Sequence, residues 1–252
     1  MATVCVILGS ASAETITLRD GLSTAFDSTI RSNATNFDRN FGASNTTIVG
    51  KTTTPDTIRS VYGFDLSTIP AGATITGVSF RLIGDSADAN STGLTDTLEL
   101  VRLNTAFTEG SGDGTGNSAN DVTWNNRTTA TPWGTAGGDL GTVLSSLTTS
   151  SDNFVAGQSL SFGASAAFIS AIQSIADADG TFYFTIKGTA ALEAQATRSI
   201  FFFRSAEFAT AADRPQLTID YAVAVPEPSV FLTAGAVGLV LAHVVRRRTF
   251  AA

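Results

Sequence analysis

Short stretches in which apolar and polar residues alternate recur along this chain, and this period of two restricts its fold more than any other feature. They cover residues 58–66, 78–82, 182–186 and 217–221. Successive side chains of a β-strand point to opposite faces, so the pattern indicates antiparallel strands with one buried face. The alternation therefore predicts an all-β fold. Weaker strand candidates lie at 46–50, 97–103, 121–124 and 199–204.

Only one segment has helical periodicity. Between residues 166 and 176, Phe168, Ile169, Ile172 and Ile175 recur at three- and four-residue spacing, and polar residues after 176 end the pattern. Many strands with one short helix are typical of a β-sandwich. We therefore predict one domain over residues 14–224, an antiparallel jelly-roll-like β-sandwich whose single short helix covers one end.

Residues 225–252 contain three successive elements. Val225-Pro226-Glu227-Pro228-Ser229 precede an uncharged apolar run at 230–245, and Arg246, Arg247 and Arg248 follow it. Each proline disfavours helix at the residue before it, which separates the run from the domain. The run predicts a single transmembrane helix, and the arginines predict that its C-terminal flank is cytoplasmic, so that residues 14–224 face outward. A run of this length spans about 24 Å against a hydrocarbon core of roughly 30 Å, which favours transient insertion over a retained anchor.

These elements resemble the PEP-CTERM sorting signal of Gram-negative bacteria that make exopolysaccharide, and Val225 to Ser229 match its VPEPS motif. The resemblance implies cleavage near Pro226-Glu227-Pro228 by a membrane-embedded exosortase. It also implies export, with transient insertion in the inner membrane and a final location at the cell surface or in the extracellular matrix.

The N-terminus carries a shorter signal of export. Residues 3–9 are mostly apolar, and Ala11-Ser12-Ala13 is a small-x-small cleavage pattern, which together predict a signal peptide over residues 1–13 and a mature start at Glu14. Because no lysine or arginine precedes the apolar stretch, we expect this signal peptide to be truncated, with the true start codon upstream. The alternative is a disordered N-terminus.

Removing both ends leaves a domain without cysteine or histidine, because Cys5 and His243 are the only ones. This composition excludes a disulfide, a thiol nucleophile and an imidazole base in the domain. Without Glu227 and the three terminal arginines, the domain has 21 acidic residues (22 − 1) and 12 basic ones (15 − 3), which gives a net charge of −9. Such a charge argues against nucleic acid or anionic lipid as partners, and against an anionic polysaccharide unless calcium bridges the two.

A second resemblance covers roughly residues 20–221. It is carried by an ordered series of short pieces, namely Asp27-Ser28-Thr29-Ile30, Asn40-Phe41-Gly42, Thr47-Ile48-Val49-Gly50, Arg59-Ser60, Phe64-Asp65-Leu66-Ser67, Ile69-Pro70-Ala71-Gly72-Ala73-Thr74-Ile75, Val122-Thr123-Trp124-Asn125-Asn126 and Arg214-Pro215-Gln216-Leu217. The series resembles the DNRLRE domain, which implies a jelly-roll β-sandwich related to a carbohydrate-binding module and hence glycan binding. Phe107 stands where a tryptophan is expected, and a Gly/Ser/Asn-rich insertion at 110–120 follows it.

One loop-rich segment gathers residue types that bind sugars. Aromatic faces stack on sugar rings, while amides and guanidinium groups bond hydroxyls. The candidate glycan-binding residues are Trp124, Asn125, Asn126, Arg127 and Trp133. The alternative is that the two tryptophans fill the core.

Two acidic turns offer oxygen ligands of the kind that calcium prefers. One contains Asp85 and Asp88, and the other contains Asp113, Asn117 and Asp121. The alternative is that both are solvated turns. Calcium is the only cofactor that the sequence suggests.

The sequence favours a protein that is not an enzyme. We predict a non-catalytic exported protein of the envelope or extracellular matrix, processed by exosortase, that binds exopolysaccharide. A structural or adhesion β-sandwich without a defined glycan site is the first alternative. A carboxylate-based glycoside hydrolase is a remote one, since Glu99, Glu109, Glu193 and Glu207 are available but nothing in the sequence pairs them.

Overall fold

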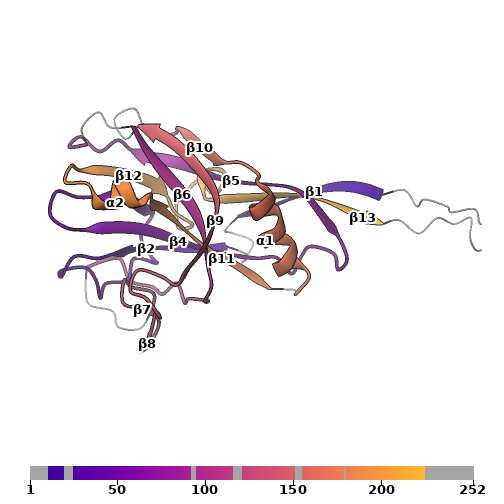
Figure 1. Cartoon of the computed structure of the whole chain (residues 1–252), viewed down its shortest axis with the longest axis horizontal. Coiled ribbons are helices and arrows are strands. Elements are labelled where there is room, and N and C mark those ends of the chain that lie inside the picture. Colours follow the sequence, from indigo (N-terminus) through magenta and orange to yellow (C-terminus); the bar gives the residue numbers. More distant parts are fainter. Residues whose placement is uncertain are drawn as a thin grey trace, which may run out of the picture.

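The computed structural model describes residues 11–19, 25–91, 95–115, 121–150, 155–178 and 180–224. Its strands pair antiparallel throughout, which confirms the all-β prediction (Figure 1). The strands are β1 (Ala11–Arg19), β2 (Ala25–Arg31), β3 (Thr46–Lys51), β4 (Thr57–Asp65), β5 (Thr74–Ser86), β6 (Thr95–Leu103), β7 (Asn126–Thr128), β8 (Thr131–Pro132), β9 (Leu140–Ser150), β10 (Ser159–Phe162), β11 (Thr181–Gly188), β12 (Ser199–Arg204) and β13 (Gln216–Ala224). The helices are α1 (Ala166–Ala176), α2 (Ala190–Ala194) and a single 3-10 turn, Ala211–Asp213.

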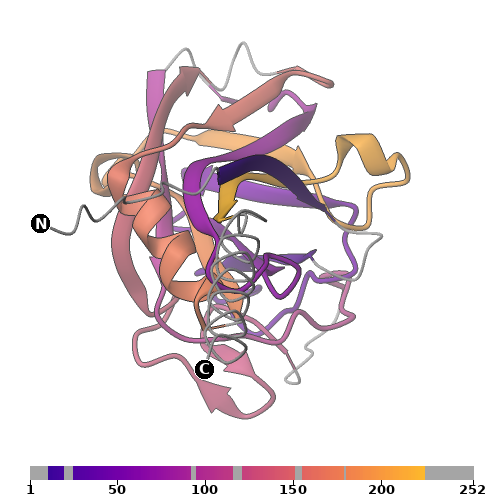
Figure 2. The ribbon, with the colours of Figure 1, turned by 90° about the vertical axis from the view of Figure 1, so that its right-hand side faces the viewer.

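Eleven of the strands form one sheet that curls over a core, in a sandwich-like arrangement (Figure 2). Its longest path runs β1-β13-β5-β12-β3-β4-β11-β6-β9, while β10 pairs with β5 and β2 pairs with β4. The register between β12 and β5 shifts at Phe202/Phe203. Such an irregularity bends a strand and increases its local twist, which helps the sheet to curl. The remaining two strands, β7 and β8, form a separate hairpin.

The main core lies inside the curl and is rich in phenylalanine. Phe80 of β5 has ring contacts with Tyr62 and Phe64 of β4 and with Phe184 of β11, at centroid distances of 5.1, 5.9 and 4.8 Å. These rings come from the alternating positions that the sequence predicted to be buried, and all four are 0% exposed. Edge-to-face aromatic pairs add to the free energy of area burial, so the core does not depend on a disulfide.

A second hydrophobic cluster lies on the outer face of β2 and β4. Val61 points to this cluster, whereas its neighbour Tyr62 points to the main core. The cluster contains Ile30, Val61, Leu103, Phe107, Val122 and Trp133. Residues 104–115 and 121–139 supply Phe107, Val122 and Trp133 to it, and we call these residues the loop layer. Central strands that are buried on both faces lose the clean alternation of apolar and polar residues.

Helix α1 has the predicted bounds, because local signals define both of its ends. The Ser165 side chain accepts a hydrogen bond from the Phe168 backbone N–H, and Asp177 ends the helix. The strands predicted at 46–50, 97–103 and 199–204 are also present.

Other predictions about the elements were wrong. Residues 121–124 form no strand and belong to the loop layer, and a second helix, α2, is present. Strands β1, β2, β7, β8, β9 and β10 were not predicted. In β9, serine and threonine fill most positions and most side chains are at least partly exposed, so no apolar alternation marks the strand.

The ends of β1 and β13, where Ala11 and Ser12 pair with Ala224 and Val223, extend beyond β5 as a two-stranded ribbon (Figure 1). Ala11 opposes Ala224 and Ala13 opposes Ala222. The predicted cleavage before Glu14 therefore falls inside a strand, and it would remove three residues that pair with β13.

The segment 225–252 lies outside the described residues, and so do the sorting motif, the predicted helix at 230–245 and the three arginines. Among the residues that the structure describes, no helix has the length and hydrophobicity needed to cross a membrane.

Candidate functional site

A pocket of about 300 Å³ lies between α1 and the neighbouring strands. One face of the helix supplies Ala167, Ser170, Ala171 and Ser174, which recur at three- and four-residue spacing. The opposite wall is formed by Arg102 of β6 and by Thr142 and Leu144 of β9. The pocket thus combines hydroxyl groups, small apolar side chains and one guanidinium group.

Arg102 reaches this pocket from the core-facing side of its strand. It is directly opposite Phe184 in the β6–β11 pair, and opposite residues of an antiparallel pair point to the same face. Phe184 is buried in the main core, as are Leu98 and Leu100 at the two preceding positions of the same parity. Arg102 therefore ends an otherwise apolar, inward-facing series. Within the described part of the chain, its side chain has no hydrogen bond or ion pair.

The helix wall of the pocket is fixed at both ends. Near its start, the Ser165 hydroxyl donates to the Leu144 carbonyl of β9 while it caps α1. Near its end, the Gln173 amide donates to the Ala73 carbonyl and accepts from the Ile75 backbone N–H. These bonds hold α1 against β9 and β5, so the pocket walls belong to a connected framework.

The five predicted sugar-binding residues all lie in the loop layer, but most of their side chains already interact with other residues of the protein. Trp124 is half-buried, and the Arg59 guanidinium lies 5.0 Å from the centroid of its ring. Asn125 donates to Asp38, and Arg127 donates to the Ala106 carbonyl. Asn126 begins β7.

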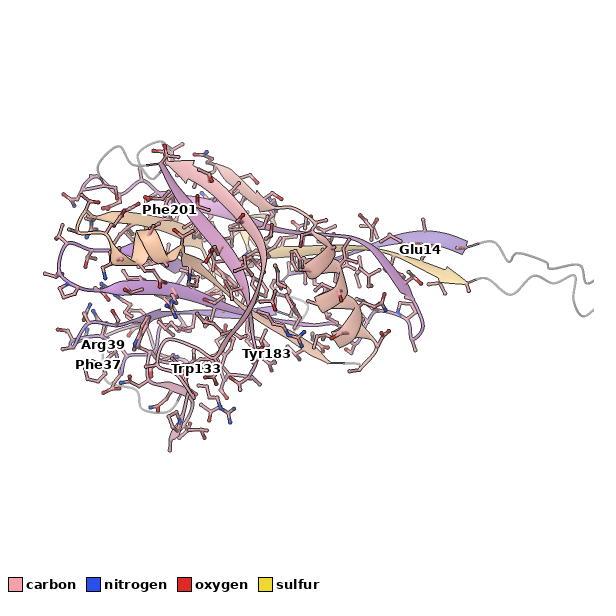
Figure 3. All side chains as sticks on the ribbon, in the orientation of Figure 1. Glu14, Phe37, Arg39, Trp133, Tyr183 and Phe201 are labelled. Carbon is pink, nitrogen blue, oxygen red and sulfur yellow. The ribbon has the colours of Figure 1, made fainter. Side chains whose placement is uncertain are left out.

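Trp133 is a core residue, which corrects its assignment to a sugar-binding surface. It is 4% exposed, and its indole N–H donates to the Thr123 carbonyl at 3.0 Å. Figure 3 shows it beside the β7–β8 hairpin, on the same side of the sheet as Tyr183. Phe107, which stands where the resemblance leads us to expect a tryptophan, is buried in the same cluster. A buried ring offers no face to a sugar.

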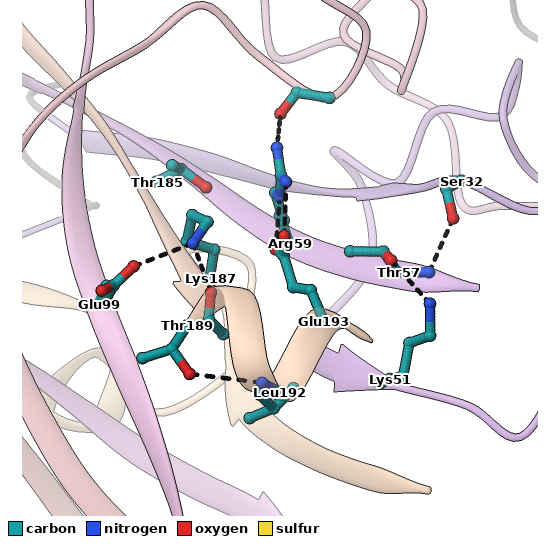
Figure 4. Close-up of polar contacts among 12 residues, drawn as sticks. Ser32, Lys51, Thr57, Arg59, Glu99, Thr185, Lys187, Thr189, Leu192 and Glu193 are labelled. Atoms are coloured by element: carbon teal, nitrogen blue, oxygen red, sulfur yellow. Dashed lines mark hydrogen bonds and ion pairs between the residues drawn. The ribbon is translucent and has the colours of Figure 1, made fainter. Parts of the chain in front are cut away.

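Arg59 connects the loop layer to the sheet and to α2. It forms a two-pronged ion pair with Glu193, with both N–O distances at 2.8 Å, and donates to the Gly137 carbonyl (Figure 4). The nearby Lys187 of β11 pairs with Glu99 of β6. Glu99 and Glu193, two of the four glutamates considered for a hydrolase, thus each form an ion pair with a basic side chain.

The other two, Glu109 and Glu207, converge with Asp27. Each of the three residues offers a carboxylate oxygen, and these oxygens lie within 4.8 Å of one another. Glu109 accepts from the Asp27 backbone N–H at 2.6 Å, and Asp27 accepts from the Ala206 backbone N–H at 2.8 Å. This group could bind a cation, but the backbone contacts also explain it as a junction between β2 and two loops.

The Asn40 side chain fixes the loop that carries Glu109. It donates to the carbonyls of Glu109 and Val122 and accepts from the backbone N–H groups of Gly42 and Gly112. Two pieces of the series that resembles DNRLRE, at 27–30 and 40–42, therefore meet at one place. Inside the core, burial raises the pKa of Tyr62 far above its ordinary value, and the negative charge of Asp27 adds to this.

The predicted calcium residues are dispersed. Asp88 forms a two-pronged ion pair with Arg198 and accepts from the Ser91 hydroxyl. Asp85 lies in β5 rather than in a turn, and Asp113 accepts from Thr115. Asp121 lies against Gly110, and Asn117 lies outside the described residues. Among the residues described, neither pair of aspartates belongs to a group of three side chains that could hold a metal ion.

Comparison with known proteins adds no assignment. No protein-family model matches the chain, and no curated protein has significant similarity to it.

Proposed function

We propose that this chain is a non-catalytic, exported β-sandwich protein of the jelly-roll type that binds exopolysaccharide. One observation carries the proposal, namely the pocket beside α1 with its lining of hydroxyl and small apolar side chains. Hydroxyl groups can donate to and accept from sugar hydroxyls, and small apolar groups can contact the face of a sugar ring. Its volume is at the lower end of the range for ligand sites, which is suitable for one sugar unit.

Binding fits this pocket better than hydrolysis does. A glycosidase needs two carboxyl groups across the scissile bond, and none of the seven lining residues that the structure describes is acidic. The carboxylates of Asp27, Glu109 and Glu207 do converge, but two of them accept backbone N–H groups. A glycosidase at that cluster stays the remote alternative, and a structural or adhesion protein without a glycan site stays the first one.

Affinity electrophoresis in gels that contain the host exopolysaccharide tests the binding, with and without calcium. Residues 11–224 are the sample, because they contain both hydrophobic clusters and all described strand pairs. We expect the gel to retard this domain, and we expect Ser170→Tyr to abolish the effect, because Ser170 is exposed at the pocket and a tyrosine would fill it. Ser161→Tyr, at an exposed position away from the pocket lining, is the control.

The other outcomes separate the alternatives. Loss of retardation in Trp124→Ala but not in Ser170→Tyr would move the site to the loop layer. Retardation only with calcium would favour the acidic groups as ligands. Free migration in every gel would overturn the proposal and favour a structural or adhesion role, whereas shortening of the polymer would favour the glycosidase.

We also propose that exosortase processes the chain at the Pro226-Glu227-Pro228 motif after transient insertion of residues 230–245 in the inner membrane. The sequence motif and the arginines at 246–248 support this proposal. Replacement of the three motif residues by alanine should leave an uncleaved protein in the inner membrane, as measured by fractionation and immunoblotting. Normal release of that variant would refute the sorting proposal.

A further inference from the structure

We infer that the pocket beside α1 selects an acidic sugar, with Arg102 pairing with the sugar carboxylate. This inference rests on the proposed function and narrows its substrate class to uronate-containing exopolysaccharide. Its starting point is the position of Arg102, which follows Leu98 and Leu100 on the face of β6 that points to the core.

An inward-facing guanidinium group loses hydration, and an anion has to compensate for that loss. The chain contains acidic residues in excess, and it supplies one to each of five other cations of the described chain, namely Arg31, Arg59, Lys187, Arg198 and Arg204. It supplies none to Arg102, whose side chain has no polar partner among the described residues. The arginine is half-buried and lines the pocket, so a ligand can provide the missing anion.

The lining favours a carboxylate on a polyhydroxylated ring. A guanidinium group matches a planar carboxylate through two parallel hydrogen bonds. Among the described residues that line the pocket, Arg102 is the only cation, which suits a monoanion. Thr142, Ser170 and Ser174 are exposed hydroxyl residues around the same space and can bond the ring hydroxyls. Leu144 and Ala171 are buried and provide an apolar floor.

The net charge of −9 does not oppose this pairing at physiological salt. Charges that are separated by more than about 10 Å are largely screened at 0.1 M salt, whereas a contact inside a pocket is screened much less. The general repulsion that argued against an anionic polysaccharide therefore acts at long range, and Arg102 acts at short range.

The test compares glucuronate with glucose, which have the same ring and differ at the carboxylate. Binding to the full chain in non-ionic detergent is measured by saturation-transfer NMR and by titration. We expect glucuronate to bind at least about tenfold more tightly than glucose, the difference that a charge-assisted pair provides. Arg102→Leu should abolish this preference, and Arg102→Lys should retain part of it. Arg81→Leu, which removes an arginine that lies outside both the pocket lining and the candidate sugar-binding residues of the loop layer, should leave this preference unchanged.

Loss of binding in Arg102→Leu should not come from unfolding, because leucine extends the apolar series of Leu98 and Leu100. The melting temperature of Arg102→Leu should therefore match or exceed that of the parent.

Equal binding of glucose and glucuronate, or an unchanged preference in Arg102→Leu, would overturn the inference. Equal competition by acetate or sulfate would overturn it too, because the pocket would then be a general anion site. If the full chain also ignores the exopolysaccharide in the gel assay, the proposed function itself fails. If the polymer binds while Arg102→Leu has no effect, only this inference fails.

Discussion

Charged residues in this molecule mainly connect segments that are far apart in the sequence. Asp88, which follows β5, pairs with Arg198, which directly precedes β12, and Arg59 of β4 pairs with Glu193 of α2. The Asp88 side chain is 5% exposed, so its pairing takes place in a region of low water content. Burial raises the pKa of Asp88, but the hydrogen bonds from Arg198 and Ser91 outweigh burial, and the pKa lies below its ordinary value.

Asp88→Asn should lower the free energy of unfolding by about 1–3 kcal/mol at pH 7, because Arg198 loses its anionic partner. Since the folded-state pKa is lowered, the ion pair stabilises the protein fully above the unfolded-state value of about 4, and the stabilisation is lost as the pH falls through the folded-state pKa. Urea denaturation at pH 7 and at pH 2.5 should therefore show a difference between parent and variant that shrinks in acid.

Asp213→Asn is the matched control for this prediction. Asp213 pairs with Arg204, but its side chain is 31% exposed, so we expect an effect below about 1 kcal/mol. A difference between parent and Asp88→Asn that stays constant across this pH range would show that charge is not its source.

Among the elements, α1 illustrates how a helix is attached to the sheet by a few polar bonds. Its N-cap, Ser165, bonds both the helix and the Leu144 carbonyl, whereas Thr189, the N-cap of α2, bonds only the Leu192 backbone N–H, at 3.4 Å. The buried residues of α1 are Phe168, Ala171 and Ile172, and those of α2 consist of Leu192. The pocket therefore depends on the more firmly attached helix.

Ser165→Ala should lower the free energy of unfolding by about 1–2 kcal/mol, because one N–H of the helix and one carbonyl of β9 lose their partner. Thr189→Ala, the control at the weaker cap, should have an effect of about 0.5 kcal/mol. Chemical denaturation measures both. Equal effects of the two substitutions would contradict the double role of Ser165.

Strand β3 requires glycine where it meets β12. Gly50 has a φ of +139°, and a Cβ atom there would lie 2.0 Å from the Ser199 carbonyl oxygen. Gly50→Ala should therefore destabilise the protein by at least about 2 kcal/mol, since strain and a backbone clash act together. Gly72→Ala is the control, because Gly72 has a φ of +78° and no atom within 4 Å of the added Cβ, and we expect about 1 kcal/mol there. Equal decreases in melting temperature for the two variants would contradict the predicted backbone clash at Gly50.

For the whole molecule, the β1–β13 ribbon determines where the chain ends leave the domain. Ala11 and Ala224 are partners at its tip, away from the loop layer and from the sheet edge formed by β9 (Figure 1). Ala224, the last residue before the proposed sorting segment, therefore lies beside the N-terminal strand. In the proposed pathway, this ribbon would separate the exosortase site from the body of the domain.

A circular permutant tests this placement. Joining Ala224 to Ala11 through Asn-Gly should give a tight hairpin, and new ends between the exposed residues Ala71 and Gly72 should interrupt only a turn. We expect this permutant to fold with a free energy of unfolding within about 2 kcal/mol of the parent. Circular dichroism and urea denaturation measure it, and a twelve-residue linker in place of Asn-Gly is the control. Folding only with the long linker would contradict the pairing of Ala11 with Ala224.

The strength of local signals explains which elements could be predicted. The positions of Phe80 and Phe184 followed from alternation, and the bounds of α1 followed from its apolar spacing and its flanking polar residues. Strand β9 carries mostly serine and threonine, and residues 121–124 resemble a strand although they cover the second hydrophobic cluster. In both cases the surrounding structure, rather than the local pattern, determines the conformation.

The sequence by itself determined the all-β class, the inward parity of the main strands, the helix, and the absence of cysteine and histidine from residues 14–224. Each depends on residues close together in the chain or on composition. Tertiary structure decided that Trp133 is buried, that Glu109 and Glu207 meet Asp27, and that Arg102 faces the pocket beside α1. These outcomes depend on contacts between residues up to 180 positions apart (207 − 27), and only the curled sheet brings such residues together.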